Sequence, residues 1–339
     1  MPTPQSGVAV VGSANIDIVF AVERVPRPGE TLLADRAALY PGGKGLNQAV
    51  AAARAGAVTT FIGAIGRDDH GAALARVLEG DGLDRQQLRL SDESTGQAFI
   101  VVDPAGENTI VVASGANATM GSMTDADAAA ISRCSVLLMQ LELPLAAVTD
   151  AARIARTAGV VVMLNAAPAA SVPAELLDLL DYLIVNEHEA CLIAGLDDLA
   201  AASTKLAGLV PRLVVTLGAN GSALYDGGVE VARIPARVVD EGDVVDTTGA
   251  GDTFCGALAA ALAEGGSPAN SSPTNSQPTN SQPTNSQPTN SQPANSSRDY
   301  LRAANFATAA AALSVQKAGA VPSIPYRSDI DLTLMEKTR

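Results

Sequence analysis

Short β-branched runs alternate along this chain with alanine-rich stretches of helical character. The runs predict strands over residues 8–11, 59–62, 136–139, 160–164, 182–185 and 213–216. The stretches predict helices over residues 46–55, 72–78, 145–157 and 250–263. Such alternation is typical of βαβ units, so we predict an α/β fold with a mostly parallel central sheet and helices on both faces. Ligands of these sheets bind beyond the carboxyl ends of the strands.

Two early regions break this alternation. Residues 18–40 and 97–113 contain strand-like runs with no helix between them, which predicts a small separate sheet. Surface hairpins would explain the same pattern.

Residues 267–297 differ in kind, because Pro-Thr-Asn-Ser-Gln recurs there with a proline every fifth residue. Proline breaks helices, and polar residues without aliphatic neighbours do not offset the entropy of ordering. We predict a disordered surface insertion, and its composition favours a passive repeat expansion over a partner-binding arm.

Composition sets broad limits on function. With 339 residues, 47% of them hydrophobic, the chain can bury a large core. The formal charge of −14 disfavours a nucleic-acid partner. Cys134, Cys191 and Cys255 are too scattered to suggest a disulfide framework or a zinc site. Residues 1–7 lack the basic start of a secretory signal, and no apolar run reaches the roughly 20 residues of a membrane span, so we expect a cytoplasmic protein without a membrane partner.

The segment D-T-T-G-A-G-D-T-F at residues 246–254 leads directly into one of the predicted helices. Gly249, Ala250 and Gly251 let backbone amides approach a ligand, and a helix N-terminus attracts phosphate oxygens. Asp252, in the first turn, could accept a proton from an attacking hydroxyl, as phosphoryl transfer requires. An ordinary helix start, with the acid favouring the dipole, fits the segment about as well.

A second glycine-rich segment, P-G-G-K-G-L-N-Q at residues 41–48, precedes another predicted helix. Lys44 and Asn47 are three residues apart, so both can face one side of the first turn and donate to the hydroxyls of a polyol. Neither segment completes a Walker A or a G-x-G-x-x-G motif.

These motifs belong to a longer ordered series. It also contains G-S-A-N-I-D at 12–17, T-G-Q-A-F-I-V-V-D at 95–103, G-E-N-T-I at 106–110, M-Q-L-E at 139–142, N-E-H-E at 186–189, T-L-G-A-N-G at 216–221 and K-A-G-A-V-P-S at 317–323. The series resembles the ribokinase-like (PfkB) carbohydrate kinases over almost the whole chain. The resemblance implies one kinase domain over residues 1–339, with the small sheet as a lid over the sugar that often carries a homodimer contact. The family has a short connection where this chain has its repeat.

The resemblance also implies roles for individual residues. Asp252 would be the general base, and the amides of Gly249, Ala250 and Gly251 would stabilise the transferring phosphoryl group. The implied sugar-binding positions are Asn15, Asp17, Gly43, Lys44, Asn47, Glu142 and Asp252. Spacing alone would equally allow a strand-end turn at Asn15 and Asp17, and solvated surface charges at Lys44 and Glu142.

For the nucleotide, the resemblance implies contacts from Asn186, Thr216, Gly218, Ala219, Asn220, Gly221, Gly251 and Asp252. Glu189 would lie near Mg²⁺ and hold it through water, although Asn186 with Glu189 would also suit a helix cap. An activating potassium ion is implied at Asp246, Thr248, Ser314, Lys317, Gly319 and Ser323, several of which would bind through backbone carbonyls.

The resemblance therefore implies ATP-dependent phosphorylation of D-ribose at its 5-hydroxyl, giving ribose 5-phosphate and ADP. A related kinase of deoxyribose, another sugar or a nucleoside is the nearest alternative. A non-catalytic sugar-binding regulator is a second class of hypothesis, but binding alone needs no base at Asp252.

Overall fold

In the computed structural model, which describes residues 7–104, 108–265 and 297–336, nine strands form one large sheet. They are β1 (Gly7–Val11), β4 (Val58–Gly66), β5 (Asp84–Ser91), β8 (Val136–Met139), β9 (Val161–Asn165), β10 (Tyr182–Asn186), β11 (Arg212–Thr216), β12 (Ser222–Asp226) and β13 (Val229–Ile234). Their order is β13-β12-β11-β10-β9-β8-β1-β4-β5. Every neighbouring pair from β11 to β5 is parallel, whereas β12 is antiparallel to both its neighbours.

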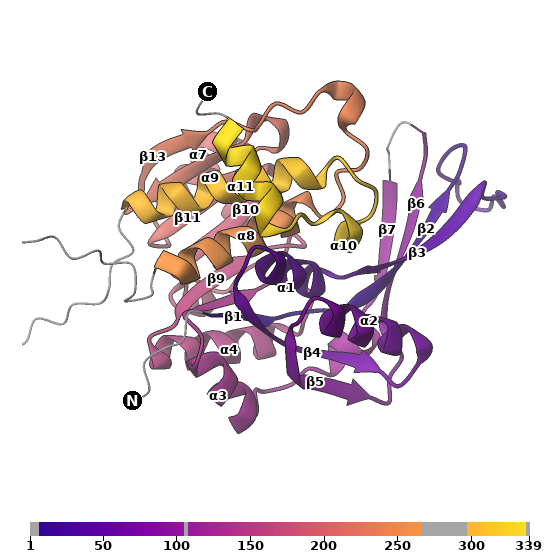
Figure 1. Cartoon of the computed structure of the whole chain (residues 1–339), viewed down its shortest axis with the longest axis horizontal. Helices are drawn as coiled ribbons and strands as arrows, with labels where there is room; N and C mark the ends of the chain where they lie inside the picture. The colour runs from indigo at the N-terminus through magenta and orange to yellow at the C-terminus, as the bar shows by residue number, and fades with distance from the viewer. Residues whose placement is uncertain (1–6, 105–107, 266–296, 337–339) are drawn as a thin grey trace, which may run out of the picture.

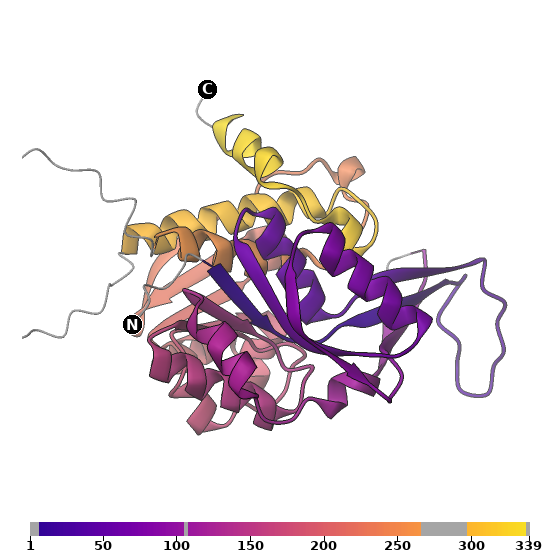
Figure 2. The same cartoon turned by 60° about the horizontal axis from the view of Figure 1, so that its bottom comes forward.

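Helices cover both faces of this sheet (Figures 1 and 2). One layer contains α1 (Lys44–Arg54), α2 (Asp69–Gly80), α8 (Ala250–Gly265), α9 (Ser297–Ser314), α10 (Ala320–Ser323) and α11 (Arg327–Glu336). The other contains α3 (Asp125–Ser132), α4 (Leu145–Ala158), α5 (Ala174–Leu177), α6 (Glu187–Ala194) and α7 (Leu199–Ala207). Alternate residues of a strand face opposite layers. Val8 and Val10 therefore pack in the first core, and Ala9 and Val11 in the second.

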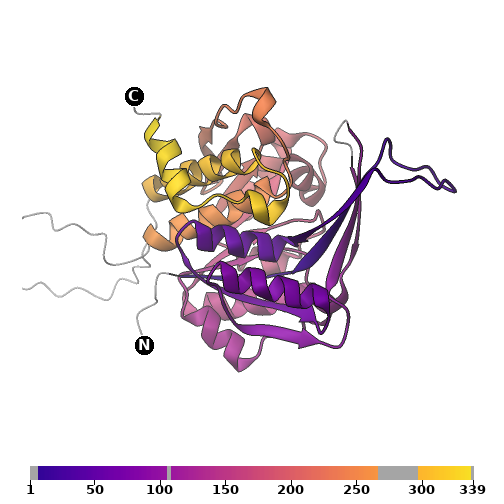
Figure 3. The ribbon, with the colours of Figure 1, turned by 45° about the vertical axis from the view of Figure 1, so that its right-hand side comes forward.

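A small four-stranded sheet stands at one end of the large one (Figure 3). Its strands are β2 (Asn15–Ala21), β3 (Arg36–Gly42), β6 (Gly96–Val102) and β7 (Asn108–Ala113), in the order β3-β2-β6-β7. Because β2 begins four residues after β1 ends, the small sheet is rooted at the carboxyl ends of the parallel strands. The predicted fold class is confirmed, with the first predicted strand pair interrupted between residues 21 and 36.

Each of the six predicted strands and four predicted helices is present, with ends shifted by a few residues. The structure also contains β5, the β12–β13 hairpin and several helices that were not predicted, including α3, α6, α7 and α9. The predicted disordered insertion lies outside the described residues, except that Ser297 begins α9. Among the helices that are described, none has the length and apolar character that a membrane crossing requires.

Candidate active site

The order in which the chain adds parallel strands to the large sheet reverses between β1 and β8. From β1 the sheet continues through β4 to β5, and from β8 through β9 to β10, so the crevice beyond these two strands is the expected ligand position. Two polar side chains meet there. The Ser13 hydroxyl, after β1, donates to Glu142 Oε2, after β8, at 2.5 Å.

The same pair of residues closes the start of α1. Glu142 Oε2 accepts from the Lys44 amide at 3.0 Å, and Ser13 accepts from Gly45 through its hydroxyl and from Leu46 through its carbonyl. Gly43 precedes the helix with φ of 89°, and a Cβ there would lie 2.7 Å from the Asn15 amide. The N-terminus of α1 is therefore satisfied within the protein and offers no free amides to a phosphate.

The start of α8 is open. The Ala250 amide donates to the Thr247 carbonyl at 3.2 Å, and the Thr253 amide to the Gly249 carbonyl at 2.8 Å. Between them, the amides of Gly251 and Asp252 have no acceptor among the residues that the structure describes. A Cβ on Gly251 would meet no atom within 4 Å. Of the three predicted amides, those of Gly249 and Gly251 have no acceptor within the described part of the chain, and Asp252 adds another. The space in front of Gly251 is available for an anion.

Asp252 lies in this first turn with only 7% of its surface exposed. Its Oδ2 accepts from Asn47 Nδ2 at 2.9 Å, and its Oδ1 accepts from Gln48 Nε2 at 2.9 Å. Both donors belong to α1, which packs against α8. The two amide donors therefore hold each carboxyl oxygen of Asp252 in a defined position.

The residues predicted to bind a sugar gather beside Asp252. Asn15 lies at the start of β2, and its Oδ1 accepts from Asn117 Nδ2 at 2.7 Å. Asn117 Oδ1 in turn accepts from the Ala14 amide at 3.0 Å, so it fixes the turn between the two sheets. Asn117 and Ser13 are supporting residues that the sequence analysis did not assign.

Asp17 has the most perturbed carboxyl group of this cluster. Burial, followed by the charges of Glu142 and Asp252, raises its pKa to about 7 from an ordinary 3.8, against the lowering effect of Lys44. A Cβ on Gly42 would lie 2.1 Å from Asp17 Oδ2, so the first glycine of the G-G-K segment leaves room for this carboxyl group.

Lys44 is the cation among these acids. Burial alone would lower its pKa, but Asp252, Glu142 and Glu189 together raise the pKa above its ordinary value, so the ammonium stays charged. It also lines the neighbouring cavity and therefore connects the two halves of the site.

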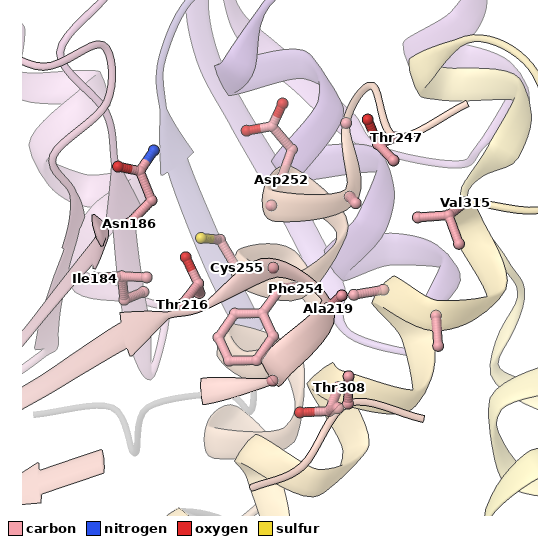
Figure 4. A pocket seen from close by; sticks show the side chains of 18 of the residues that line it. Ile184, Asn186, Thr216, Ala219, Thr247, Asp252, Phe254, Cys255, Thr308 and Val315 are labelled. Atoms are coloured by element: carbon pink, nitrogen blue, oxygen red, sulfur yellow. The ribbon is translucent and has the colours of Figure 1, made fainter. Parts of the chain in front are cut away.

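That cavity has a volume of about 850 Å³ (Figure 4). In Figure 4, Asp252 lies at the start of α8, with Asn186 on the left and Val315 on the right. Of the predicted nucleotide-binding residues, Asn186, Thr216, Gly218, Ala219, Gly221, Gly251 and Asp252 line it. Asn220 does not line the cavity and is an exposed residue of the turn before β12.

The wall that the sequence analysis missed is apolar. The residues that contribute to it are Phe254 of α8, Ala311 of α9, Val315 just after α9, and Val238 and Val244 between β13 and α8. Val238 is 95% exposed. A large exposed aliphatic residue at the mouth of a cavity suits the flat face of an aromatic ligand group.

Asn186 and Glu189 form a capping box at the start of α6. Asn186 Oδ1 accepts from the Glu189 amide at 2.8 Å, and Glu189 Oε2 accepts from the Asn186 amide at 2.8 Å. Both residues also line the cavity, and burial raises the pKa of Glu189. Its Oε1 has no hydrogen-bond partner within the described part of the chain, so one oxygen remains for a hydrated cation.

Of the residues predicted to hold a monovalent cation, Asp246 connects two loops. Its Oδ1 accepts from the Thr248 amide and its Oδ2 from the Gly319 amide, both at 2.8 Å. The hydroxyls of Ser314 and Ser323 are buried and donate to carbonyls of their own helices, and the Lys317 amide donates weakly to the Ser314 carbonyl at 3.4 Å. A hydroxyl that donates its hydrogen keeps the lone pairs of its oxygen, so these hydroxyls and the backbone carbonyls both remain candidate ligands.

The model of the pfkB family carbohydrate kinases matches residues 5–327. The chain belongs to this family. It is 37% identical over 333 residues to a ribokinase of Haemophilus influenzae, covering 95% of this chain and 96% of that protein. It is 40% identical over 267 residues to a bifunctional ribokinase/ribose-5-phosphate isomerase A of Fructilactobacillus sanfranciscensis, covering 75% of this chain and only 48% of that longer protein.

Solved structures agree with this assignment to the pfkB family. The ribokinase of Arabidopsis thaliana, solved with ribose and ATP, is 33% identical with a TM-score of 0.81. The match covers 97% of this chain and 99% of that one. The match to this family therefore includes both sheets of the structure.

Proposed function

We propose that this pfkB-family protein is an ATP-dependent ribokinase that phosphorylates the 5-hydroxyl of D-ribose. The observation that carries the proposal is the position of Asp252. It lines the cavity that contains the predicted nucleotide residues, and it is hydrogen-bonded to Asn47 of the predicted sugar cluster. The relatives named ribokinase, and the ribokinase solved with ribose and ATP, support this choice of substrates.

In the proposed reaction, Asp252 accepts the proton of the sugar hydroxyl. The hydroxyl oxygen forms a bond to the γ-phosphorus of ATP while the bond from that phosphorus to the ADP oxygen breaks. The amides of Gly251 and Asp252 would donate to the oxygens of the transferring group, and Lys44 adds a positive charge close to Asp252 and Glu189.

Glu189 and the loops around Asp246 would hold the cations. A hydrated Mg²⁺ fits Glu189, because one of its oxygens is free and magnesium keeps several waters. When bound with ATP, Mg²⁺ supplies positive charge to the phosphate oxygens. A potassium ion fits the carbonyls of the loops that Asp246 joins beside the open start of α8.

We further propose that the small sheet is a lid over the sugar and a homodimer contact. Its strand β7 is at the edge of the sheet, and all of its residues are exposed. Ile110, Val111 and Val112 on β7 and Phe99 on β6 are exposed hydrophobic residues, which favours burial against a second copy of this chain. Sedimentation velocity tests this part, and a monomer throughout the micromolar range would reject it.

Coupled measurement of ADP release tests the proposed activity. The assay contains Mg-ATP and a panel of pentoses, hexoses and nucleosides, with and without potassium at constant ionic strength. Potassium-stimulated turnover selective for D-ribose is the expected result. Turnover of a different panel member would change the assigned substrate, and sugar binding without turnover would favour a non-catalytic regulator.

The Asp252→Asn variant tests the role of the base. Asparagine keeps the shape but does not take up a proton, so we expect kcat to fall by about 10²- to 10⁴-fold. Sugar binding, measured by calorimetry, is expected to persist. Retained activity in this variant would contradict the assignment of Asp252 as general base.

A further inference from the structure

A chain of buried carboxamide side chains lies behind Asp252 and has no part in the proposed reaction steps. We propose that Gln48, supported by Gln140, is a positioning residue that holds the Asp252 carboxylate in one orientation for proton abstraction. The inference rests on the proposed kinase activity. Neither Gln48 nor Gln140 lines the nucleotide cavity, so neither is placed to contact that ligand.

The chain joins five parts of the fold, which are the segment after β8 and the elements α1, α8, β9 and β10. Gln140 Nε2, just after β8, donates to Gln48 Oε1 on α1 at 2.6 Å. Gln48 Nε2 donates both to Asp252 Oδ1 at 2.9 Å and to Asn165 Oδ1, at the end of β9, at 3.0 Å. Asn165 Nδ2 then donates to the Ile184 carbonyl of β10 at 3.3 Å. Gln48 is fully buried and Gln140 is 1% exposed, so water does not compete with these bonds.

The direction of the chain is fixed at one end by the main chain. The Ile184 carbonyl only accepts, so Asn165 must turn its NH₂ group toward it and its oxygen toward Gln48. Gln48 must then present its own NH₂ group to Asn165, which also places that group on Asp252. A flip of the Gln48 amide would bring its oxygen against two other oxygens.

Gln140 holds Gln48 in this orientation by donating to the remaining oxygen. The cost falls on Gln140, whose own Oε1 is buried without a partner among the described atoms. Gly12 makes the position possible, because a Cβ there would lie 2.2 Å from that oxygen. A buried polar atom without a partner is unfavourable. The unpaired Oε1 of Gln140 therefore indicates that the bond from Gln140 Nε2 to Gln48 Oε1 is required.

This arrangement gives the two oxygens of Asp252 different tasks. Oδ1 is held by Gln48 on the protein side, and Oδ2 is held by Asn47 on the side of the sugar cluster. Each carboxylate oxygen has two lone pairs, so Oδ2 keeps one for the sugar hydroxyl. With Oδ1 fixed, rotation of the carboxylate about its Cβ–Cγ bond is restricted, and the proton acceptor is oriented before the sugar binds.

The test compares Gln48→Met, Gln140→Met and the double variant with the wild type. Methionine conserves volume and removes the donor. We expect Gln48→Met to lower kcat by about 10- to 100-fold, the loss of one hydrogen bond to a charged group, with KM for the sugar changed by less than about twofold. Gln140 acts only through Gln48, so we expect Gln140→Met alone to lower kcat by roughly 3- to 10-fold. In the double variant, kcat should be no lower than in Gln48→Met.

Thr253→Val is the matched control. Thr253 follows Asp252 on the same helix, and its buried hydroxyl has no partner among the described atoms. Its replacement removes a buried polar atom near the site without breaking the chain, so kcat should stay within about twofold of the wild type. Melting temperatures of all variants report whether the fold is preserved.

The inference is overturned if Gln48→Met keeps the wild-type kcat, if its loss appears in KM instead, or if the two single effects add in the double variant. If Gln48→Met does not fold, Gln140→Met is the test. A lower kcat with an unchanged KM supports the inference, and an unchanged kcat or a change in KM alone overturns it. Kinetics use whichever panel sugar the wild type phosphorylates. A wild type that is silent on every sugar overturns the proposed function and this inference together, whereas an active wild type with unaffected variants overturns the inference alone.

Discussion

Asp17 gives this protein a specific dependence of stability on pH. Its pKa is about 7 in the folded protein because of burial and then of the charges of Glu142 and Asp252, and the ordinary value is 3.8. The folded state therefore binds the Asp17 proton more tightly than the unfolded chain does. The contribution of this group to folding is intact below pH 3.8, is lost progressively as pH rises toward 7, and is fully lost above that value.

The magnitude follows from the gap between the two pKa values. At 1.36 kcal/mol for each pH unit, the gap from 3.8 to about 7 corresponds to roughly 4 kcal/mol of unfolding free energy above pH 7. Asp17 is only partly buried by surface area, so solvent screening reduces this figure and we expect on the order of 2 kcal/mol.

The Asp17→Asn variant removes the titration and keeps the shape. Urea unfolding of wild type and variant from pH 5 to pH 8.5 should show the variant gaining on the wild type as pH rises, with the difference levelling off above pH 7 to 8. Asp35→Asn, which changes an exposed carboxylate on the loop before β3, serves as the control and should show no such trend. A difference between Asp17→Asn and wild type that is constant with pH, or that shrinks as pH rises, would refute the reasoning.

Two further substitutions test the glycine and the loop contacts of the site. Gly43→Ala places a Cβ 2.7 Å from the Asn15 amide at a φ of 89°, so we expect a loss of about 1–3 kcal/mol in unfolding free energy and weaker sugar binding, whereas Gly121→Ala, with open space around it, should change little. Asp246→Asn weakens the link to the amides of Thr248 and Gly319, so we expect the potassium stimulation of turnover to fall while ribose binding persists; full stimulation, measured against potassium at constant ionic strength, would argue against a cation site there.

The sequence predicted the parallel sheet because its strands are short β-branched runs. Such runs can be recognised as buried strands without knowing which strands pair with them. It did not predict β13, where exposed residues such as Glu230 interrupt the pattern, or β12, the short buried strand that pairs with it. It also assigned no role to Ser13 and Asn117, whose hydrogen bonds reach residues between 32 and 129 positions away along the chain. Spacing along a chain carries no signal for such contacts.

The two glycine-rich helix starts show the same limit within the site. Both have small residues before an alanine-rich run, and local sequence allows either to bind an anion. Glu142, from the end of β8, occupies the amide of Lys44 and closes the first. No side chain among the described residues occupies the amides of Gly251 and Asp252 in the second. Which start is free to bind phosphate is therefore decided by the sheet topology that places Glu142, and only the structure supplies it.

Packing between α1 and α8 finally determines where the proposed base lies. Gly256 follows Asp252 by about one helical turn, and a Cβ on it would lie 2.4 Å from the Gln48 carbonyl and 2.5 Å from Ala51 Cβ. The missing side chain lets the two helices approach closely, and this approach puts the Asn47 and Gln48 amides within 2.9 Å of the Asp252 carboxylate. Both helices belong to the same buried core, so their packing on the large sheet sets the positions of the Asp252 carboxylate and its two amide donors. These positions do not depend on where the small sheet lies. A lid that moves with the sugar would therefore leave the proton acceptor in place.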